Sequence, residues 1–119
     1  MPLEFLPGDY LVFQLESGFG ILRILHRDDS TDGLIWHIAV YSDLFLDVES
    51  IENSDSWAHD LSVAIPHVAM TNRSFESTQV AFLANIPLSS HELIPLEKWR
   101  SDPDRAVVDR SVRLMLGLR

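Results

Sequence analysis

Three apolar segments separated by short turns fill the first third of the chain, and they constrain its fold more than any other feature. They span residues 10–15, 19–27 and 34–41 and are rich in Val, Ile, Leu, Phe and Tyr. β-branched and aromatic side chains of this kind favour strands. Glu16-Ser17-Gly18 and residues 28–33 lie between the segments and are typical of turns. The pattern predicts an antiparallel meander of three strands.

The second of these segments predicts a strand that is buried on both faces. Its side chains alternate between two largely apolar sets, one formed by Ile21, Arg23 and Leu25 and the other by Leu22, Ile24 and His26. Gly20 near its start indicates a bulge or a close backbone approach, as in the bent strands of small barrels.

Two more strands are expected at residues 61–70 and 80–86, which brings the total to about five. Pro66 restricts the first of them to a sheet edge, a bulge or a strand start, because proline cannot donate a hydrogen bond to a ladder. Between the third and fourth strands, residues 42–61 are expected to be mostly loop. A short helical turn at residues 56–59, capped by Ser54 or Asp55, fits this part of the sequence.

The end of the chain predicts a helix from Pro103 to about Leu116. Asp102 fits the N-cap, Pro103 the first helical position and Gly117 the C-terminal cap. The apolar stripe that would pack on the sheet consists of Val108, Val112 and Met115. We therefore predict an α+β fold: a bent antiparallel sheet or SH3-like partly open barrel of about five strands with the C-terminal helix packed on it. A helix-on-sheet layer without barrel curvature remains the alternative.

Composition indicates one domain, residues 1–119, in a reducing compartment. A chain of 119 residues with 46% hydrophobic residues can bury one core without staples. The absence of cysteine excludes disulfides, thiolate zinc sites and cysteine nucleophiles. No apolar run approaches the roughly 18 residues of a membrane span, and the first five residues lack the basic start of a signal peptide. We expect a cytoplasmic protein.

The charge is distributed unevenly along the chain. The net charge is −9, yet residues 1–60 hold two basic and twelve acidic side chains, and no Lys or Arg lies between Arg27 and Arg73. An acidic face of this kind repels nucleic acid and attracts a basic protein partner. The residues predicted to bind such a partner are Asp43, Asp47, Glu49, Glu52, Asp55, Trp57 and Asp60. A merely solvated surface is the other interpretation of the charges, and Trp57 would then fold back onto the core.

The motifs that would indicate catalysis or a cofactor are weak. Residues 28–33 resemble the start of a calcium loop, but its twelfth position is Ala39 instead of Glu, which favours a hairpin turn. The five histidines form no metal-binding spacing, and His37 is expected to be a half-buried strand residue with one ring nitrogen satisfied. No nucleophile elbow or phosphate loop occurs. We expect no cofactor, no metal and no enzyme activity.

Two alternatives to a protein-binding role stay open. The first is a small-ligand binder or enzyme with a pocket around His37, Tyr41 and Trp57, which would require titratable groups converging in a cleft. The second is a structural subunit, which would show a large apolar patch and form a stable homodimer.

The first quarter of the chain resembles a known bacterial family. Residues 7–13, which begin Pro7-Gly8-Asp9, precede a glycine-and-aromatic turn and a strand that carries the basic residue Arg23. This arrangement is similar to the opening of the immunity protein 26 family of polymorphic toxin systems. The resemblance implies a small β-rich domain that binds and neutralises a toxin in the same cytoplasm without catalysis. It assigns no functional residue.

Overall fold

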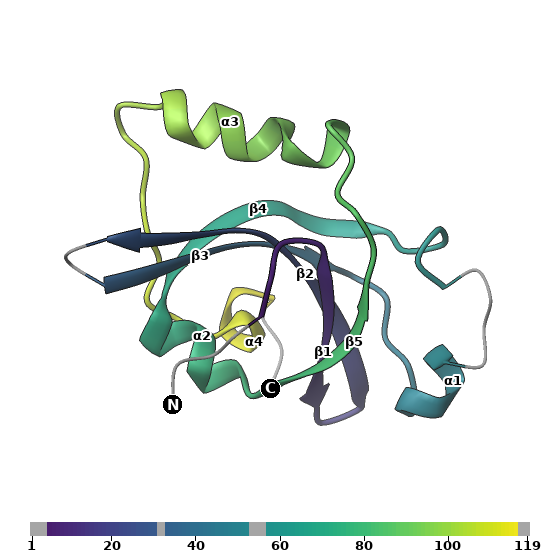
Figure 1. The fold of residues 1–119 in the computed structure, drawn as a ribbon. Helices are drawn as coiled ribbons and strands as arrows, with labels where there is room; N and C mark the ends of the chain where they lie inside the picture. The colour runs from purple at the N-terminus through teal and green to yellow at the C-terminus, as the bar shows by residue number, and fades with distance from the viewer. Residues whose placement is uncertain (1–4, 31–32, 53–56, 117–119) are drawn as a thin grey trace.

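The computed structural model describes residues 5–30, 33–52 and 57–116 and is built around a five-stranded antiparallel sheet (Figure 1). The strands are β1 Asp9–Leu15, β2 Gly18–Ser30, β3 Gly33–Tyr41, β4 Val63–Thr71 and β5 Val80–Asn85. Their order is β4-β3-β2-β1-β5, so the predicted meander forms the centre of the sheet. Each predicted strand is confirmed, and Pro66 lies in an edge strand.

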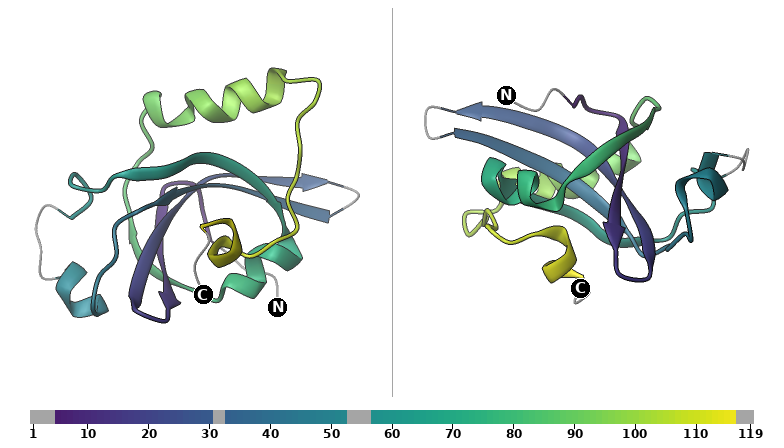
Figure 2. Two further views of the ribbon diagram at one scale, coloured as in Figure 1. Left: turned by 180° about the vertical axis from the view of Figure 1, so that it is seen from behind. Right: turned by 90° about the horizontal axis from the view of Figure 1, so that it is seen from below.

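The sheet is bent but remains open (Figure 2). Register shifts interrupt the pairing of β2 with β3 between Ile24 and His26, and that of β3 with β4 between Ile38 and Val40. Irregularities of this kind increase the local twist of a sheet. Because β4 and β5 lie at opposite edges without pairing, the strands do not close into a barrel. The α+β class and the bent sheet are thus confirmed.

Short helices cover both faces of the sheet. They are α1 Val48–Glu52, α2 Asn72–Thr78, the 3-10 turn η1 His91–Leu93, α3 Ile94–Ser101 and α4 Val112–Met115. α3 lies over one face, α2 and α4 lie against the other, and α1 lies at the end of the molecule opposite the β2–β3 hairpin (Figure 1). We call the two sides the α1–α3 face and the α2–α4 face.

The predicted helix from residue 103 to 116 is wrong in its bounds. Asp102 ends α3 with extended backbone, and residues 102–110 run on to α4 without a helix. Val108 instead forms a bridge beside Met70 of β4, and its backbone exchanges hydrogen bonds with Ala69 and Thr71. Val108 therefore pairs with the edge of β4 instead of lying in the apolar stripe of the predicted helix. The C-terminal helix itself is confirmed as α4, and Gly117 lies outside the described residues.

Local capping explains the helices that hydrophobic periodicity did not predict. The side chain of Thr71 accepts a hydrogen bond from the backbone N–H of Ser74, which begins α2 although Phe75 is its one large apolar residue. Asp47 caps α1 in the same way through Ser50. The predicted turn near residues 56–59 is only partly described: residues 57–59 form a turn, and Ser54 and Asp55 lie outside the described residues.

The main core fills the α2–α4 face. Its buried members are Leu11, Phe13, Leu15, Leu22, Ile24, Trp36, Ile38, Val40, Met70, Phe75 and Val112. The rings of Trp36 and Phe75 stack with centroids 4.2 Å apart, and the indole N–H of Trp36 donates to Asn72 at 2.9 Å. The Phe13 ring presses against Gly20, where a Cβ would lie only 2.6 Å from it. Gly20 therefore marks a close approach within regular pairing.

Candidate functional site

The α1–α3 face carries the polar and chemically versatile side chains of the sheet. Alternation along β3 directs His37, Ala39 and Tyr41 to this face, opposite the core residues of the same strand. Arg23 of β2 lies on the same side, over the ring of Tyr10 at 4.1 Å.

The acidic surface is formed by Asp43, Asp47, Glu49, Glu52 and Asp60, at the end of the molecule that carries α1. The carboxylate of Asp43 accepts a hydrogen bond from the backbone N–H of Ser62 at 2.6 Å. Asp47 accepts from the backbone N–H and the hydroxyl of Ser50, and these bonds lower its pKa. Glu49, Glu52 and Asp60 are exposed. Asp55, the seventh predicted position, lies outside the described residues.

Two exposed leucines lie within this acidic surface. Leu44 is 47% exposed and Leu46 is 85% exposed, on either side of the partly buried Phe45. The backbone of Phe45 exchanges two hydrogen bonds, of 2.7 and 2.9 Å, with Phe19 at the start of β2. Gly18 lies against this contact, because a Cβ there would be 2.4 Å from the Phe45 oxygen. The leucines are thus presented outward from a segment that is fixed to the sheet.

Trp57 belongs to a second hydrophobic cluster, so it covers the sheet instead of projecting from it. Its ring lies edge-on to Tyr10 with centroids 4.9 Å apart, and Ile51 of α1 is fully buried in the same cluster. The structure therefore assigns the ring of Trp57 to packing, the alternative that the sequence left open, while the described acidic residues lie in the segments before and after it in the chain.

A pocket of about 280 Å³ opens between α3 and the sheet. Its residues are Leu25, Ala39, Tyr41, Val63, Pro66, His91, Glu92 and Pro95, and we call it the α3 pocket. Of the three residues that the sequence grouped around a pocket, only Tyr41 borders this one. Burial raises the pKa of the Tyr41 hydroxyl, which hydrogen bonds to that of Tyr10. The pocket is therefore largely apolar with a neutral phenol on one side.

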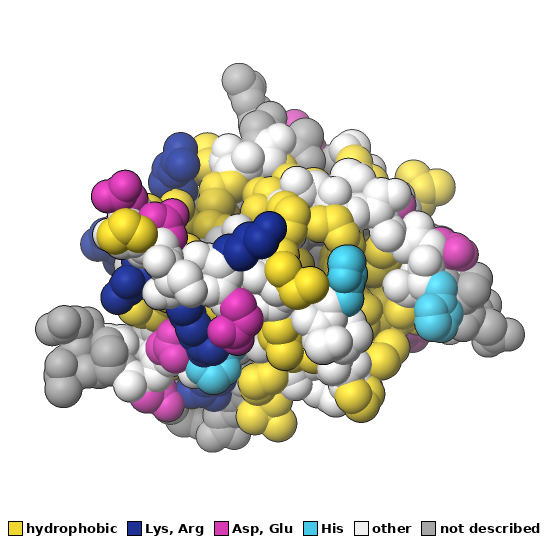
Figure 3. Space-filling view, turned by 90° about the horizontal axis from the view of Figure 1, so that it is seen from above, with side chains coloured by type: hydrophobic (Ala, Val, Ile, Leu, Met, Phe, Trp, Pro, Cys, Tyr) yellow, Lys and Arg dark blue, Asp and Glu magenta, His cyan; other side chains and the backbone are white. Residues whose placement is uncertain are grey.

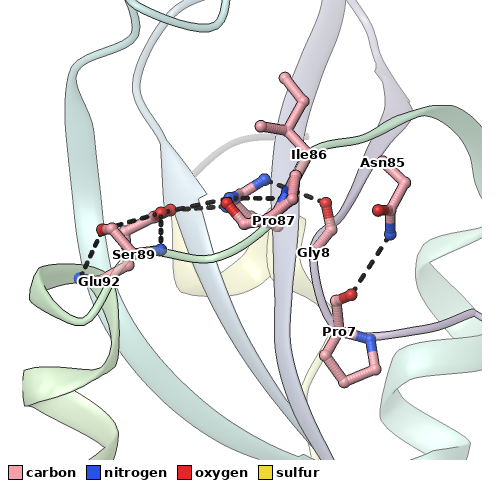
Figure 4. A network of polar contacts seen from close by, with 8 residues as sticks. Pro7, Gly8, Asn85, Ile86, Pro87, Ser89 and Glu92 are labelled. Atoms are coloured by element: carbon pink, nitrogen blue, oxygen red, sulfur yellow. Dashed lines mark hydrogen bonds and ion pairs between the residues drawn. The ribbon is translucent and has the colours of Figure 1, made fainter.

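A buried arginine holds one wall of the α3 pocket in place (Figure 4). Arg23 is 1% exposed; it donates to the carbonyl oxygens of Gly8, Ile86 and Pro87 and pairs with Glu92 at 2.6 Å. Burial acts to raise the pKa of Glu92, but hydrogen bonds from Arg23 and Ser89 outweigh it and hold the pKa below its usual value. The carboxylate is thus charged and already neutralised.

Three histidines and one aspartate form a hydrogen-bonded row under α3. Asp28 accepts from His26 at 2.9 Å and from His37 at 2.6 Å, and the other ring nitrogen of His37 lies 2.9 Å from His67. Since a carboxylate only accepts, Nε2 of His37 carries the proton and Nδ1 accepts from His67. Trp99 of α3 packs edge-on to His37 at 4.9 Å.

This row corrects the expectation for His37, which is fully buried with both ring nitrogens bonded. Burial lowers the pKa of His37, although Asp28 partly offsets the effect. Burial, His37 and Arg100 together lower the pKa of His67 to about 4. Both rings are therefore neutral at pH 7, and neither lines the α3 pocket.

Basic and acidic side chains occupy different parts of the surface. Figure 3 shows Lys and Arg side chains over and beside α3 and toward the β2–β3 hairpin, and none on the visible part of the opposite end, the one that carries α1. This agrees with the sequence, in which no Lys or Arg occurs between Arg27 and Arg73. A ligand that approaches the α1 end meets carboxylates and exposed leucines without a compensating cation.

Other classes of site receive no support within residues 5–30, 33–52 and 57–116. No group of three or more His, Cys, Asp or Glu side chains converges there to hold a metal ion. None of the helices in these ranges has the length and apolar character needed to cross a membrane. Comparison of the chain with protein-family models, curated proteins and solved structures finds no match.

Sequence reasoning missed the two leucines and most of the α3 pocket. A signal for the leucines was present, because Leu44 and Leu46 alternate with Phe45, as in an extended segment with one buried side chain. The pocket had no comparable signal, since it joins residues from β2, β3, β4, η1 and α3 that are up to 70 positions apart.

Proposed function

We propose that this chain is a binding protein that engages a basic protein partner through the acidic surface and performs no catalysis. The observation that carries the proposal is the fixed acidic segment around α1, which presents Leu44 and Leu46 among carboxylates with no Lys or Arg between Arg27 and Arg73. Apolar contacts surrounded by charge are the usual anatomy of a protein interface.

The physical reasons concern both rate and affinity. Opposite charges steer partners together and raise the association rate. Leucines that are largely exposed contribute little to folding, yet burying each against a partner removes apolar area from water. Because the segment is fixed to Phe19 and Ser62 before binding, little conformational entropy is lost on association.

A toxin in the same cytoplasm is the partner class that we propose. The resemblance of residues 7–25 to an immunity family supports it. The pairing of Glu92 with Arg23 at the α3 pocket and the internal bonding of the row of Asp28, His37 and His67 support it as well. Blocking a basic enzyme by an acidic surface needs no chemistry of its own.

Co-expression with the protein encoded in the neighbouring reading frame tests this proposal. We expect rescue of growth and a stable complex whose association rate falls as salt rises, because charges more than about 10 Å apart are screened at 0.1 M salt. The variant Glu49→Lys/Glu52→Lys reverses two exposed charges and should slow association at least about tenfold.

The matched control is Glu16→Lys/Glu97→Lys, which makes the same change in net charge elsewhere on the surface. It should leave the rate within about twofold, since a long-range effect of net charge alone is weak in salt. Absence of both rescue and complex would reject the toxin-binding role. Equal slowing by the two double variants would show that the acidic surface is not the contact.

A further inference from the structure

We infer that the α3 pocket receives one uncharged aromatic side chain from the same basic partner, flanked there by Lys or Arg residues that meet the acidic surface. The inference rests on the proposed function and adds the chemistry of the contact. Large interfaces obtain most of their affinity from a few aromatic anchors seated in pockets.

The shape and lining of the pocket favour an aromatic ring. Leu25 and Ala39 of the sheet form an apolar floor, and Val63, Pro66 and Pro95 form walls with no polar side-chain atom. A volume of about 280 Å³ equals that of roughly nine liquid waters, which is suited to one or two fused rings. Water in such a site has few hydrogen-bonding partners, so its release on binding is favourable.

Of the three ionisable side chains that line the pocket, His91 offers no negative charge to a cation, and the other two are already neutral or paired. Glu92 is bound to Arg23 at 2.6 Å and accepts from the backbone N–H of Ser89 at 3.0 Å. Burial keeps the Tyr41 phenol protonated. A cation inside the pocket would lose its hydration without gaining a free counter-charge. The occupant is therefore a neutral ring, and the basic groups of the partner stay outside.

The pocket is built before a partner arrives. The Arg23 network fixes the η1 wall to Gly8, Ile86 and Pro87 (Figure 4). Glu92 also accepts from the Ser89 hydroxyl at 3.1 Å, which holds the turn that leads into α3. Preorganised walls lower the cost of binding, because few rotamers are lost.

The pocket is continuous with the acidic surface. Tyr41 and Val63 line it, and the next residues are joined across the two strands by hydrogen bonds: Ser42 N–H donates to the Ser62 oxygen at 2.8 Å, and Ser62 N–H donates to Asp43 at 2.6 Å. The first carboxylate of the acidic surface thus lies just beyond the pocket wall. Figure 3 shows hydrophobic side chains gathered beside α3, on the side toward the end that carries α1. An aromatic side chain of the partner can therefore occupy the pocket while its basic neighbours contact the acidic surface.

Two probes test the inference separately from the proposed function. Indole, a neutral ring, reports on the pocket alone. The second probe is a pair of synthetic peptides, Lys-Lys-Gly-Trp-Gly-Lys-Lys and the same peptide with alanine in place of tryptophan. Backbone amide shifts are followed by NMR during titration of the full chain. We expect indole to shift Ala39 and Val63 saturably, and the tryptophan peptide to bind at least about tenfold more tightly than the alanine peptide.

Filling the pocket should remove this preference. Ala39→Leu fills the floor, and Val63→Trp covers the pocket from its exposed rim, so that the second variant remains informative if the first does not fold. Both should abolish indole binding and equalise the two peptides. The control Ala81→Leu enlarges an exposed position on β5 and should keep the tenfold difference.

The outcomes separate the two ideas. If indole does not bind, or if the peptides bind equally to the unmodified chain, the aromatic anchor is overturned, whatever the acidic surface does. If indole and the tryptophan preference behave as expected but Glu49→Lys/Glu52→Lys leaves peptide affinity unchanged, the anchor stands and the proposed acidic contact fails. If Ala39→Leu and Val63→Trp both still bind the tryptophan peptide more tightly than the alanine peptide, the assignment of the ring to this pocket is also overturned.

Discussion

The two faces of the sheet bury different kinds of side chain. On the α2–α4 face the main core is apolar, Trp36 and Phe75 stack within it, and the buried polar side chains of α2 are two small hydroxyls. On the α1–α3 face the buried set includes Arg23 and His37, and a pocket remains between α3 and the sheet. A chain that needed only stability would gain by filling the second face as it fills the first. The difference agrees with the proposal that one face supports the fold while the other takes part in recognition.

The largest effect on stability is expected on the α2–α4 face. Phe75→Ala should lower the free energy of unfolding by about 3–5 kcal/mol, because it removes a fully buried ring and leaves a cavity beside Trp36. Urea unfolding measures the change. The control Phe82→Ala removes a ring that is mostly exposed on β5 and should cost less than about 1 kcal/mol. Equal losses would contradict the assignment of the main core to this face.

Breaking the buried ion pair should have the next largest effect. Arg23→Leu is expected to cost about 3 kcal/mol, because it removes the opposite charge from Glu92 and a hydrogen-bond donor from three backbone carbonyl oxygens. Thermal unfolding of this variant should be compared with that of Arg23→Leu/Glu92→Leu. The double variant should recover part of the loss, since it no longer leaves a carboxylate unpaired. A double variant less stable than the sum of the single changes would contradict this account.

Acid should destabilise the α1–α3 face before the α2–α4 face. The folded-state pKa values of His37 and His67 lie below the unfolded value, the latter at about 4, so the folded state resists protonation. Their contribution is present above pH 6.5 and is lost as pH falls toward 4. We expect a loss on the order of 1 kcal/mol over this range, measured by urea unfolding at each pH.

The carboxylate of Asp28 affects stability at a lower pH than the histidines do. Asp28 has a lowered pKa because the hydrogen bonds and charges of His37 and His26 outweigh its burial, so its contribution disappears only below the usual pKa of about 4. The variant His67→Gln should flatten the slope between pH 6.5 and 4 and leave the slope below pH 4 unchanged. His59→Gln, which changes an exposed histidine, is the control and should leave both slopes as they are.

The smallest effect on stability is expected at the exposed leucines. Leu46→Ser should change the free energy of unfolding by less than about 0.5 kcal/mol, because the side chain is 85% exposed. Leu114→Ser, which changes another exposed leucine on α4, should alter the free energy of unfolding equally little. Only Leu46→Ser should weaken a complex with the proposed toxin partner, by roughly tenfold in calorimetric titration. An equal loss of affinity in the two variants would argue against the acidic surface.

Local patterns were enough to predict the sheet. The meander of residues 10–41 depends on alternation, β-branched residues and turn glycines that lie next to one another in the chain. The acidic surface was predictable for the same reason, because five of its residues lie within one stretch of 18 positions. The structure adds that Leu44 and Leu46 lie among them and that Trp57 packs inward.

The C-terminal region shows where local patterns fail. Asp102, Pro103 and Val108 fit a helix start and an apolar stripe, but Val108 is bound to the edge of β4, nearly 40 positions earlier in the chain. A backbone hydrogen bond to a sheet edge satisfies the same donor and acceptor as a helix would. Tertiary contact, which no single window contains, decides between them.

The sequence by itself determined the strands, the single α+β architecture and the segregation of charge, because each depends on neighbours along the chain. Only the tertiary structure decided that Arg23 is buried against Glu92, that His37 and His67 share a hydrogen bond, and that Ala39 forms the floor of a pocket under α3. These contacts join residues that are 30 to 69 positions apart. Their energies depend on burial and on partner geometry, which exist only once the sheet has bent and the helices have packed on it.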